Sequence, residues 1–292
     1  SVGGFAAANF IWKNRYVIDG SYRLSGSSKF GADKRTAPFW SVGAGYNLHN
    51  ENFIKDLGFV DMLRLRGSYG YTGSVKFDSY QAISTYFYSI NYLHYAGVGA
   101  VPMEMANPDL TWQTTKKFNV GLTSSFFGDR LNVNFDYYTE KTDDMLIDVS
   151  LPPSSGATSV KNNFGSQDSK GLEFSLWGKI IQNRDWMWSV SLNGLHSKTT
   201  IKEISDALKR KNELNGQHQD EVAPRLQFRE NESPTAIYAV RSAGIDPASG
   251  KEIFIKKDGT YTYEYDPADQ MACGDTNPKL QGTFSSLLQY KN

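Results

Sequence analysis

The sequence has only one cysteine, Cys273, so the chain cannot form an internal disulfide bond. It also lacks long hydrophobic runs, because no segment approaches the ~18 consecutive apolar residues of a transmembrane helix. These absences do not exclude a membrane β-barrel, because barrel strands alternate apolar and polar residues and have a low average hydropathy. Neither sign of charge is in excess, because 31 basic residues balance 31 acidic ones. This balance argues against a partner recognised by charge alone, such as a nucleic acid.

Motifs for catalysis are missing as well. The histidines are scattered without an HExxH spacing or a His/Cys cluster, and there is no G-x-S-x-G sequence. Asp143 and Asp144 are adjacent, but neighbours on a strand point to opposite sides. We therefore expect no enzyme active site, no cofactor and no metal site. We interpret the histidines as ordinary turn or strand residues: His49, His94, His196 and His218.

The strongest positive signal is a strict alternation of apolar and polar residues between positions 117 and 141. This period predicts two strands, each with one apolar and one polar face. The Gly128-Asp129 loop between them predicts a type II′ turn. Each strand approaches the ~9–11 residues that a tilted strand needs to cross a bilayer. The turn also sets three cross-strand pairs on the apolar face: Phe126 with Leu131, Leu122 with Phe135, and Val120 with Tyr137.

Similar alternation recurs along the whole chain. A short helix is predicted at 50–58, with Asn50 as its N-cap. Another is predicted from the spacing of Ile201, Ile204 and Leu208, and Asp258-Gly259 predicts a small hairpin. Nine long strands are predicted, at residues 2–12, 16–25, 40–48, 63–72, 118–126, 131–138, 172–177, 186–194 and 280–290.

The connections between these strands alternate in length. Short turns are followed by long connections, apart from an intermediate one at 49–61, and the long ones span 26–39, 74–113, 143–168 and 199–278. This asymmetry is typical of outer-membrane barrels, which have short periplasmic turns and long outer loops. Aromatic residues near strand ends, such as Trp12, Tyr16 and Trp186, fit an interfacial girdle. Bacterial barrels have even strand numbers, so we expect these strands to be part of a larger barrel, cut at both ends.

Seven sequence blocks stand out along the chain: RLSGSSKFG at 23–31, PFWSVGAGY at 38–46, LRLRGSYGYTG at 63–73, NPDLTWQ at 107–113, NNFG at 162–165, SKGLE at 169–173 and GIDPASGK at 244–251. Taken together and in this order, they resemble the barrel of the SusC/RagA family of TonB-linked outer-membrane transporters. Two positions depart from the family pattern, with Ser25 in place of the usual Asp and Gln113 in place of the usual Glu. The family's calcium-like loop is also absent, because residues 265–278 lack the spacing of calcium ligands.

The resemblance implies an all-β fold, an antiparallel up-and-down transmembrane β-barrel of 22 strands around an N-terminal plug. Residues 1–292 would be a C-terminal portion of that barrel without the plug, a multi-pass protein of the bacterial outer membrane in contact with lipid and lipopolysaccharide. The resemblance implies TonB-dependent uptake of oligosaccharides or peptides together with a SusD-like surface lipoprotein. TonB–ExbB–ExbD would supply the energy through the plug. The basic run at 209–211 is either a contact for lipopolysaccharide phosphates or a solvated face.

Two groups of residues are candidates for function. Aromatic faces stack on sugar rings, so a tyrosine-rich outer loop predicts ligand contacts, although tyrosines also pack at protein interfaces. Charged residues on the polar strand faces are expected to face the lumen or the plug. The loop tyrosines are Tyr80, Tyr86, Tyr88, Tyr92 and Tyr95, and the lumen-facing residues are Arg64, Arg66, Lys117, Asp136 and Glu173.

Two other functions fit the same strand pattern. One is a surface β-sheet module that binds carbohydrate, and the other is a passive porin. In a soluble module, a second sheet would cover the apolar faces of the long strands. In a barrel, the same faces would form one continuous belt, about 25 Å tall, that is exposed to lipid.

Overall fold

The computed structural model describes residues 2–30, 34–75, 84–95, 97–151, 154, 156, 159–163, 165–217 and 227–291. The chain forms two compact units. The first contains residues 1–163, 168–198 and 279–292, and the second contains 164–167 and 199–278.

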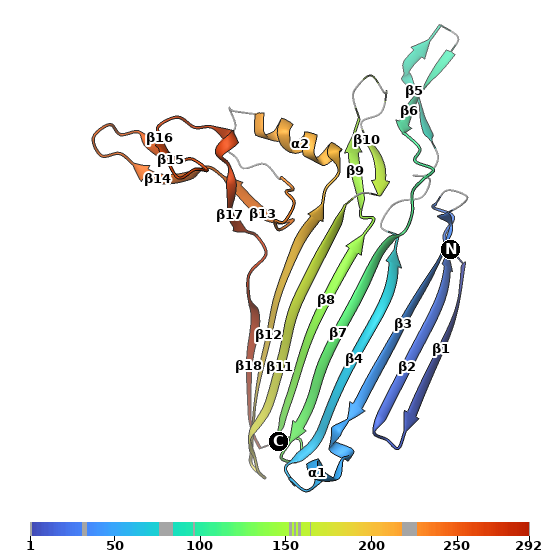
Figure 1. Cartoon of the computed structure of the whole chain (residues 1–292), viewed down its shortest axis with the longest axis vertical. Helices are drawn as coiled ribbons and strands as arrows, with labels where there is room; N and C mark the ends of the chain where they lie inside the picture. The colour runs from blue at the N-terminus through green and yellow to red at the C-terminus, as the bar shows by residue number, and fades with distance from the viewer. Residues whose placement is uncertain are drawn as a thin grey trace. The chain divides into compact units, whose positions relative to one another are not determined.

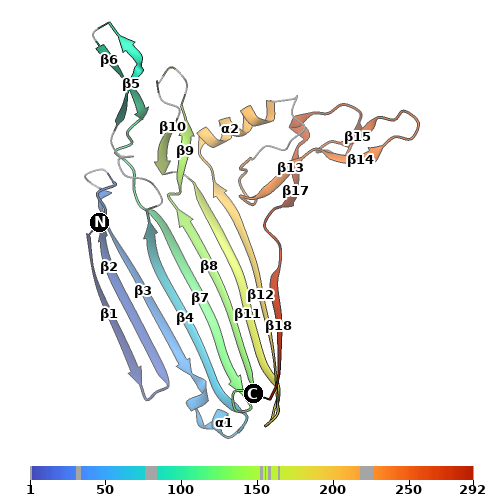
Figure 2. The same cartoon turned by 180° about the vertical axis from the view of Figure 1, so that it is seen from behind.

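The first unit is built on one antiparallel sheet of nine strands (Figure 1, and from behind in Figure 2). Neighbouring strands of this sheet follow one another along the chain, and the elements between them form separate small sheets and short helices, which is an up-and-down arrangement. The prediction of nine long strands is therefore confirmed. In spatial order they are β1 (Val2–Trp12), β2 (Tyr16–Gly26), β3 (Thr36–Asn47), β4 (Val60–Ser74), β7 (Gln113–Phe126), β8 (Leu131–Asp143), β11 (Ser166–Gln182), β12 (Trp186–Glu203) and β18 (Gln281–Tyr290).

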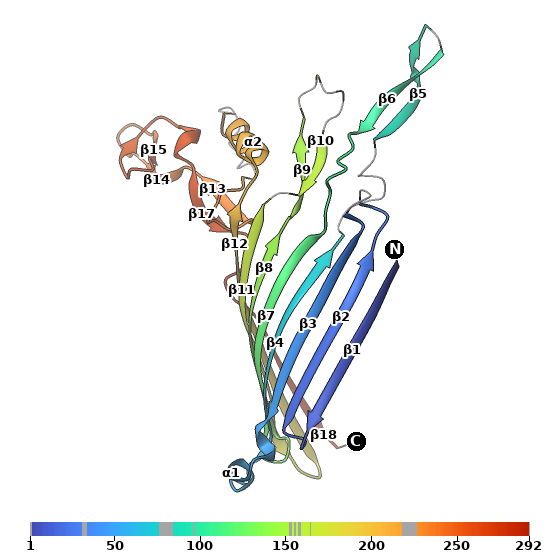
Figure 3. The ribbon, with the colours of Figure 1, turned by 45° about the vertical axis from the view of Figure 1, so that its right-hand side comes forward.

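The sheet is curved but open, as Figure 3 shows. Among the described residues, β1 pairs only with β2, and β18 pairs only with β12. None of the helices that the structure describes is long and apolar enough to cross a membrane.

The register of β7 and β8 agrees with the alternation in the sequence. Phe126 pairs with Leu131, and Leu122 pairs with Phe135. The predicted turn type is wrong, because residues 127–130 form a longer loop in which Phe127, Gly128 and Asp129 all have positive φ.

A carboxylate from another strand stabilises this longer turn. Asp61 lies at a bulge of β4, and its Oδ2 accepts hydrogen bonds from the backbone N–H groups of Gly128 at 2.7 Å and Asp129 at 3.1 Å. Asp61 is distant in sequence from the turn, so the local pattern at 128–129 could not reveal it.

The helix predicted at 50–58 is shorter than expected. A 3-10 turn, η2 (Leu48–Asn50), precedes α1 (Asn52–Lys55), and Gly58 follows with φ of 71°. Asn50 is not the N-cap, because its side-chain amide instead donates to the carbonyl of Asn14 at 2.8 Å.

Three of the long connections carry secondary structure of their own. In the first unit these are the hairpins β5 (Thr85–His94) with β6 (Gly97–Glu104), and β9 (Leu146–Ser150) with β10 (Ser159–Asn163). The second unit contains α2 (Asp206–Gln217), the pair β13 (Ala236–Ala239) and β17 (Met271–Asp275), the 3-10 turn η4 (Pro267–Asp269), and the sheet β14 (Arg241–Ile245), β15 (Glu252–Ile255) and β16 (Tyr261–Thr262).

Two predictions for this second unit have different outcomes. The hairpin around Asp258-Gly259 is confirmed as β15–β16. The helix is confirmed only in part, because Ile201 lies on β12 and α2 begins at Asp206.

Candidate functional site

The nine-stranded sheet has one apolar face, which the described residues do not cover. Representative large side chains on this face keep 39–71% of their surface exposed. Soluble monomers rarely expose so many large apolar side chains together on one face. Representative residues are Phe10, Ile18, Trp40, Leu65, Phe118, Phe135, Leu192 and Phe284.

The opposite face is polar and carries ion pairs that join different strands. Arg66 on β4 and Asp136 on β8 lie in one row with Gly121 of β7 between them. The guanidinium donates to both carboxylate oxygens at 2.7 Å. A Cβ at position 121 would collide with the Asp136 carboxylate and lie 2.6 Å from Arg66 Nε. The missing side chain therefore lets this pair lie flat on the sheet.

The five residues predicted to face the lumen all lie on this polar face. Lys117 pairs with Glu140 at 2.6 Å, so it and the Arg66–Asp136 pair have their partners within the sheet. Arg64 lies across Gly45, and its buried Nε has no hydrogen-bond partner.

Glu173, the fifth of these residues, lines a hollow of about 550 Å³ over β8, β11, β12 and β18. Polar residues around it supply amides, hydroxyls and a second carboxylate, and no described lining residue is basic. The polar residues are Asn134, Asp136, Ser175, Asn193, Gln281 and Thr283.

A second hollow of about 740 Å³ lies on the polar face at the end of the sheet where the long connections leave. Buried rings form part of its base. Phe30 and Trp112 have ring centroids 4.7 Å apart, Phe39 and Trp112 5.3 Å, and Leu110 completes the cluster. The blocks 23–31, 38–46 and 107–113 that carried the resemblance therefore meet at this cluster.

Two asparagine side chains form hydrogen bonds with the backbone of the segments next to this cluster. Asn163 accepts from the Thr111 N–H at 2.7 Å and donates to the Thr111 and Asp144 carbonyls at 2.8 and 3.0 Å. Asn107 donates to the Lys161 carbonyl at 2.8 Å. The sequence analysis did not single out these asparagines as functional, and the signal that could have done so was their presence in two of the family blocks.

The predicted ligand tyrosines do not form one described group. Tyr86 and Tyr88 lie two residues apart on β5, so they share a face, and both are exposed. Tyr92 lies on β5 where the register with β6 shifts, Tyr95 lies in the turn, and Tyr80 is outside the described residues.

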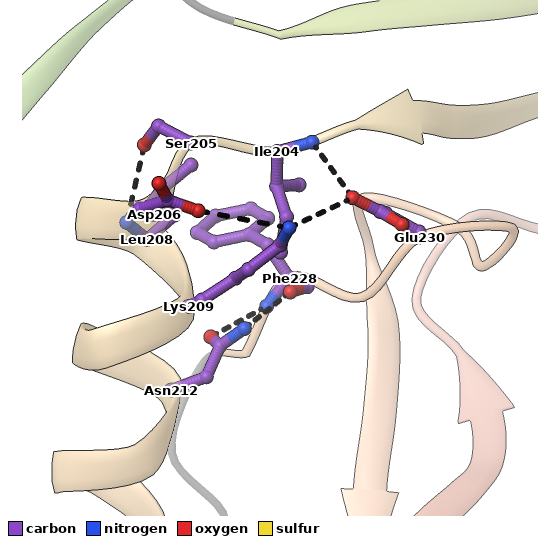
Figure 4. Close-up of polar contacts among 8 residues, drawn as sticks. All are labelled: Ile204, Ser205, Asp206, Leu208, Lys209, Asn212, Phe228 and Glu230. Atoms are coloured by element: carbon purple, nitrogen blue, oxygen red, sulfur yellow. Dashed lines mark hydrogen bonds and ion pairs between the residues drawn. The ribbon is translucent and has the colours of Figure 1, made fainter.

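The second unit has a helix held by polar contacts (Figure 4). The Ser205 hydroxyl accepts from the Leu208 N–H at 3.1 Å as an N-cap. Lys209 lies 3.5 Å from Glu230 and 3.8 Å from Asp206, so the first cation of the basic run has acidic partners. Asn212 accepts from the Phe228 N–H at 3.0 Å and donates to the Phe228 carbonyl.

In the part of the chain that the structure describes, no three His, Cys, Asp or Glu residues form a metal-binding group. Cys273 is exposed, His49 binds the backbone of Leu63, His196 binds the carbonyl of Lys279, and His218 is outside the described residues.

A curved antiparallel sheet with an uncovered apolar face and an ion-paired polar face is the wall of a transmembrane β-barrel. Residues 1–276 match the family model described as TonB dependent receptor-like, beta-barrel. The chain belongs to this family, and its resemblance to SusC/RagA transporters is confirmed.

Individual relatives agree with this membership. The chain is 30% identical to TonB-dependent receptor P3 of Formosa agariphila over all of its own length and 30% of that protein. It is 31% identical to TonB-dependent receptor SusC of Bacteroides thetaiotaomicron, over 66% of the chain and 20% of SusC. The structure of the RagAB peptide transporter matches with a TM-score of 0.85 and 31% identity, covering 99% of this chain and 31% of the other. The chain thus spans less than a third of the length of these three.

Proposed function

We propose that this chain forms part of the barrel wall of an outer-membrane importer that takes up oligosaccharides or peptides by TonB-dependent transport. The uncovered apolar face of the nine-stranded sheet carries this proposal, because lipid is the environment that such a face requires. Residues 1–292 are then a C-terminal portion of a larger, multi-pass barrel with the plug elsewhere in the whole protein. The family is one of transporters and receptors and not a class of enzymes.

The alternation of connections gives the wall its orientation in this proposal. The turns at 13–15, 127–130 and 183–185 lie at the periplasmic rim, and the long connections at 26–39, 74–113, 143–168 and 199–278 are extracellular. The polar face then meets the lumen and the plug, where Arg64 and Glu173 have no ion pair within the described wall. Lipid and lipopolysaccharide contact the other face.

The partners follow from the family. A SusD-like surface lipoprotein closes the outer end, and TonB–ExbB–ExbD supplies energy through the plug. The loop tyrosines, Tyr86 and Tyr88 among them, contact the substrate or the lipoprotein. The RagAB match supports a peptide substrate, because that structure is titled a peptide transporter.

The test is uptake by the whole protein in its own bacterium. Cells with the gene deleted should lose growth on one glycan or peptide in a panel, and a proton uncoupler should stop uptake in wild-type cells. Uptake that continues with the uncoupler present would favour a passive porin. Recovery of the whole protein outside the outer-membrane fraction would favour a surface binding module.

A further inference from the structure

The hollow at the long-loop end of the polar face, here called the mouth hollow, has a lining of one charge sign. Arg23 comes from β2 and Lys29 from the connection that follows it, and no described lining residue is acidic. Hydroxyl groups of Ser25, Ser27 and Thr72 also line it. The hollow near Glu173 has the opposite character, since its described lining includes two carboxylates and no cation. The polar face therefore separates a basic region from an acidic one.

The mouth hollow also has a fixed base. Ser27 donates its N–H to the Arg35 carbonyl at 2.9 Å, and this hydrogen bond joins the beginning of the connection between β2 and β3 to its end. Trp112 donates its indole N–H to the Lys34 carbonyl at 3.1 Å. Because Phe30 is only 1% exposed, the segment that carries Lys29 is anchored in the aromatic cluster. A cation on an anchored segment loses less conformational freedom when it binds a ligand.

An exposed ring completes the lining. Phe5 of β1 pairs with Arg23 of β2 and is 83% exposed, so the two side chains leave neighbouring strands on the same face of the sheet. Two cations, hydroxyls and a ring suit a short oligomer that carries an anionic group beside an apolar or sugar ring surface.

We propose that the mouth hollow is a binding subsite for a carboxylate or sulfate group on the imported oligomer. Arg23 and Lys29 bind the anionic group, and Phe5 contacts the adjoining unit. This inference rests on the proposed function and narrows its substrate to negatively charged oligomers. Both an acidic glycan and an acidic peptide carry this chemistry, so the experiment separates them.

The experiment measures binding to the whole protein, purified in detergent, by isothermal titration calorimetry. The probes are trigalacturonic acid with its neutral methyl ester, and triglutamate with neutral triglutamine. We expect one acidic probe to bind more tightly than its neutral partner. Replacing one cation, as in Arg23→Gln or Lys29→Gln, should weaken it about fivefold, and replacing both roughly twentyfold. Higher salt should weaken the acidic probe alone.

Controls separate charge from folding. Arg23→Lys keeps the charge and should bind nearly as wild type. Arg184→Gln removes an exposed cation at a short turn, away from the hollow, and should change nothing. The inference is overturned if the acidic and neutral probes bind equally, if no acidic probe binds wild type, or if the Arg23→Gln and Lys29→Gln double variant binds unchanged. In these cases energised uptake by the same protein would still support the proposed function, and its absence would refute that function separately.

Discussion

Glycines on the polar face determine where its charged side chains can lie. Gly121 leaves space for the Arg66–Asp136 pair, and Gly43 does the same for Asp19, whose carboxylate oxygens would lie 2.6 Å from an added Cβ. Each of these glycines is directly opposite a charged residue in the register of the sheet. The small residues of the strands therefore have a packing role that alternation alone does not show.

Gly121→Ala should destabilise the folded barrel by about 1–3 kcal/mol, because the new methyl group displaces a flat, hydrogen-bonded ion pair. The thermal unfolding midpoint of the whole protein in detergent measures the effect. Gly67→Ala on β4 is the matched control, since its nearest contact would be an ordinary 3.8 Å from the Asn119 carbonyl. Equal midpoints for the two variants would contradict this account of Gly121.

In the second unit, the turn after β14 depends on one carboxylate. The Ser249 hydroxyl, at 2.6 Å, holds the pKa of Asp246 below its ordinary value of 3.8, with help from the Ala248 N–H and the Tyr263 hydroxyl. A lowered pKa means that the ionised form stabilises the turn. That contribution is complete above the ordinary pKa and is lost as the pH falls through the folded value.

Ser249→Ala should raise the pKa of Asp246 toward 3.8, because it removes the largest stabilising hydrogen bond. Carbon-13 NMR of the aspartate carboxyl groups measures the titration. Asp258 is an internal reference, since the Thr260 hydroxyl holds its pKa low and is untouched by the variant. A shift of both residues would show a general change and not the loss of one contact.

At the scale of elements, α2 is joined to the segment at 227–230 by the side chain of Asn212. The amide makes two hydrogen bonds with the backbone of Phe228, as a neighbouring strand would (Figure 4). Asn212→Ala removes both and leaves half-buried backbone groups unpaired, which costs about 1–3 kcal/mol.

Hydrogen exchange followed by mass spectrometry should show the consequence. The Phe228 amide should exchange roughly 5 to 150 times faster in Asn212→Ala, the ratio that corresponds to that energy. Glu213→Ala is the control, because its exposed side chain is next along the same helix. Unchanged protection in both variants would mean that apolar packing alone fixes the helix.

The elements that the sequence predicted best are those whose signal is local. Alternation identified nine strands and the register of β7 with β8, since each strand has one apolar and one polar face. It could not identify the four-residue turn, because Asp61 belongs to a distant strand. It also could not predict the cluster of Phe30, Phe39 and Trp112, which assembles from separate segments.

At the scale of the whole molecule, the two faces of the nine-stranded sheet differ in their chemistry. The apolar face has no described cover, and the polar face holds the ion pairs and both hollows. A charge added to each face should therefore have different consequences, and the difference should depend on height along the strand.

Phe135→Arg on β8 places a charge on the apolar face and should cost about 2–4 kcal/mol if that position lies deep in the bilayer. Its neighbour Asn134→Arg faces the other side and should cost little. Leu131→Arg, beside the short turn at 127–130, should cost about 0–1 kcal/mol because it lies near the interface. Chemical unfolding of the whole protein in bilayers measures the three. If protein covers this face instead of lipid, Leu131→Arg and Phe135→Arg should be comparably damaging, because burial against protein does not follow depth in a bilayer.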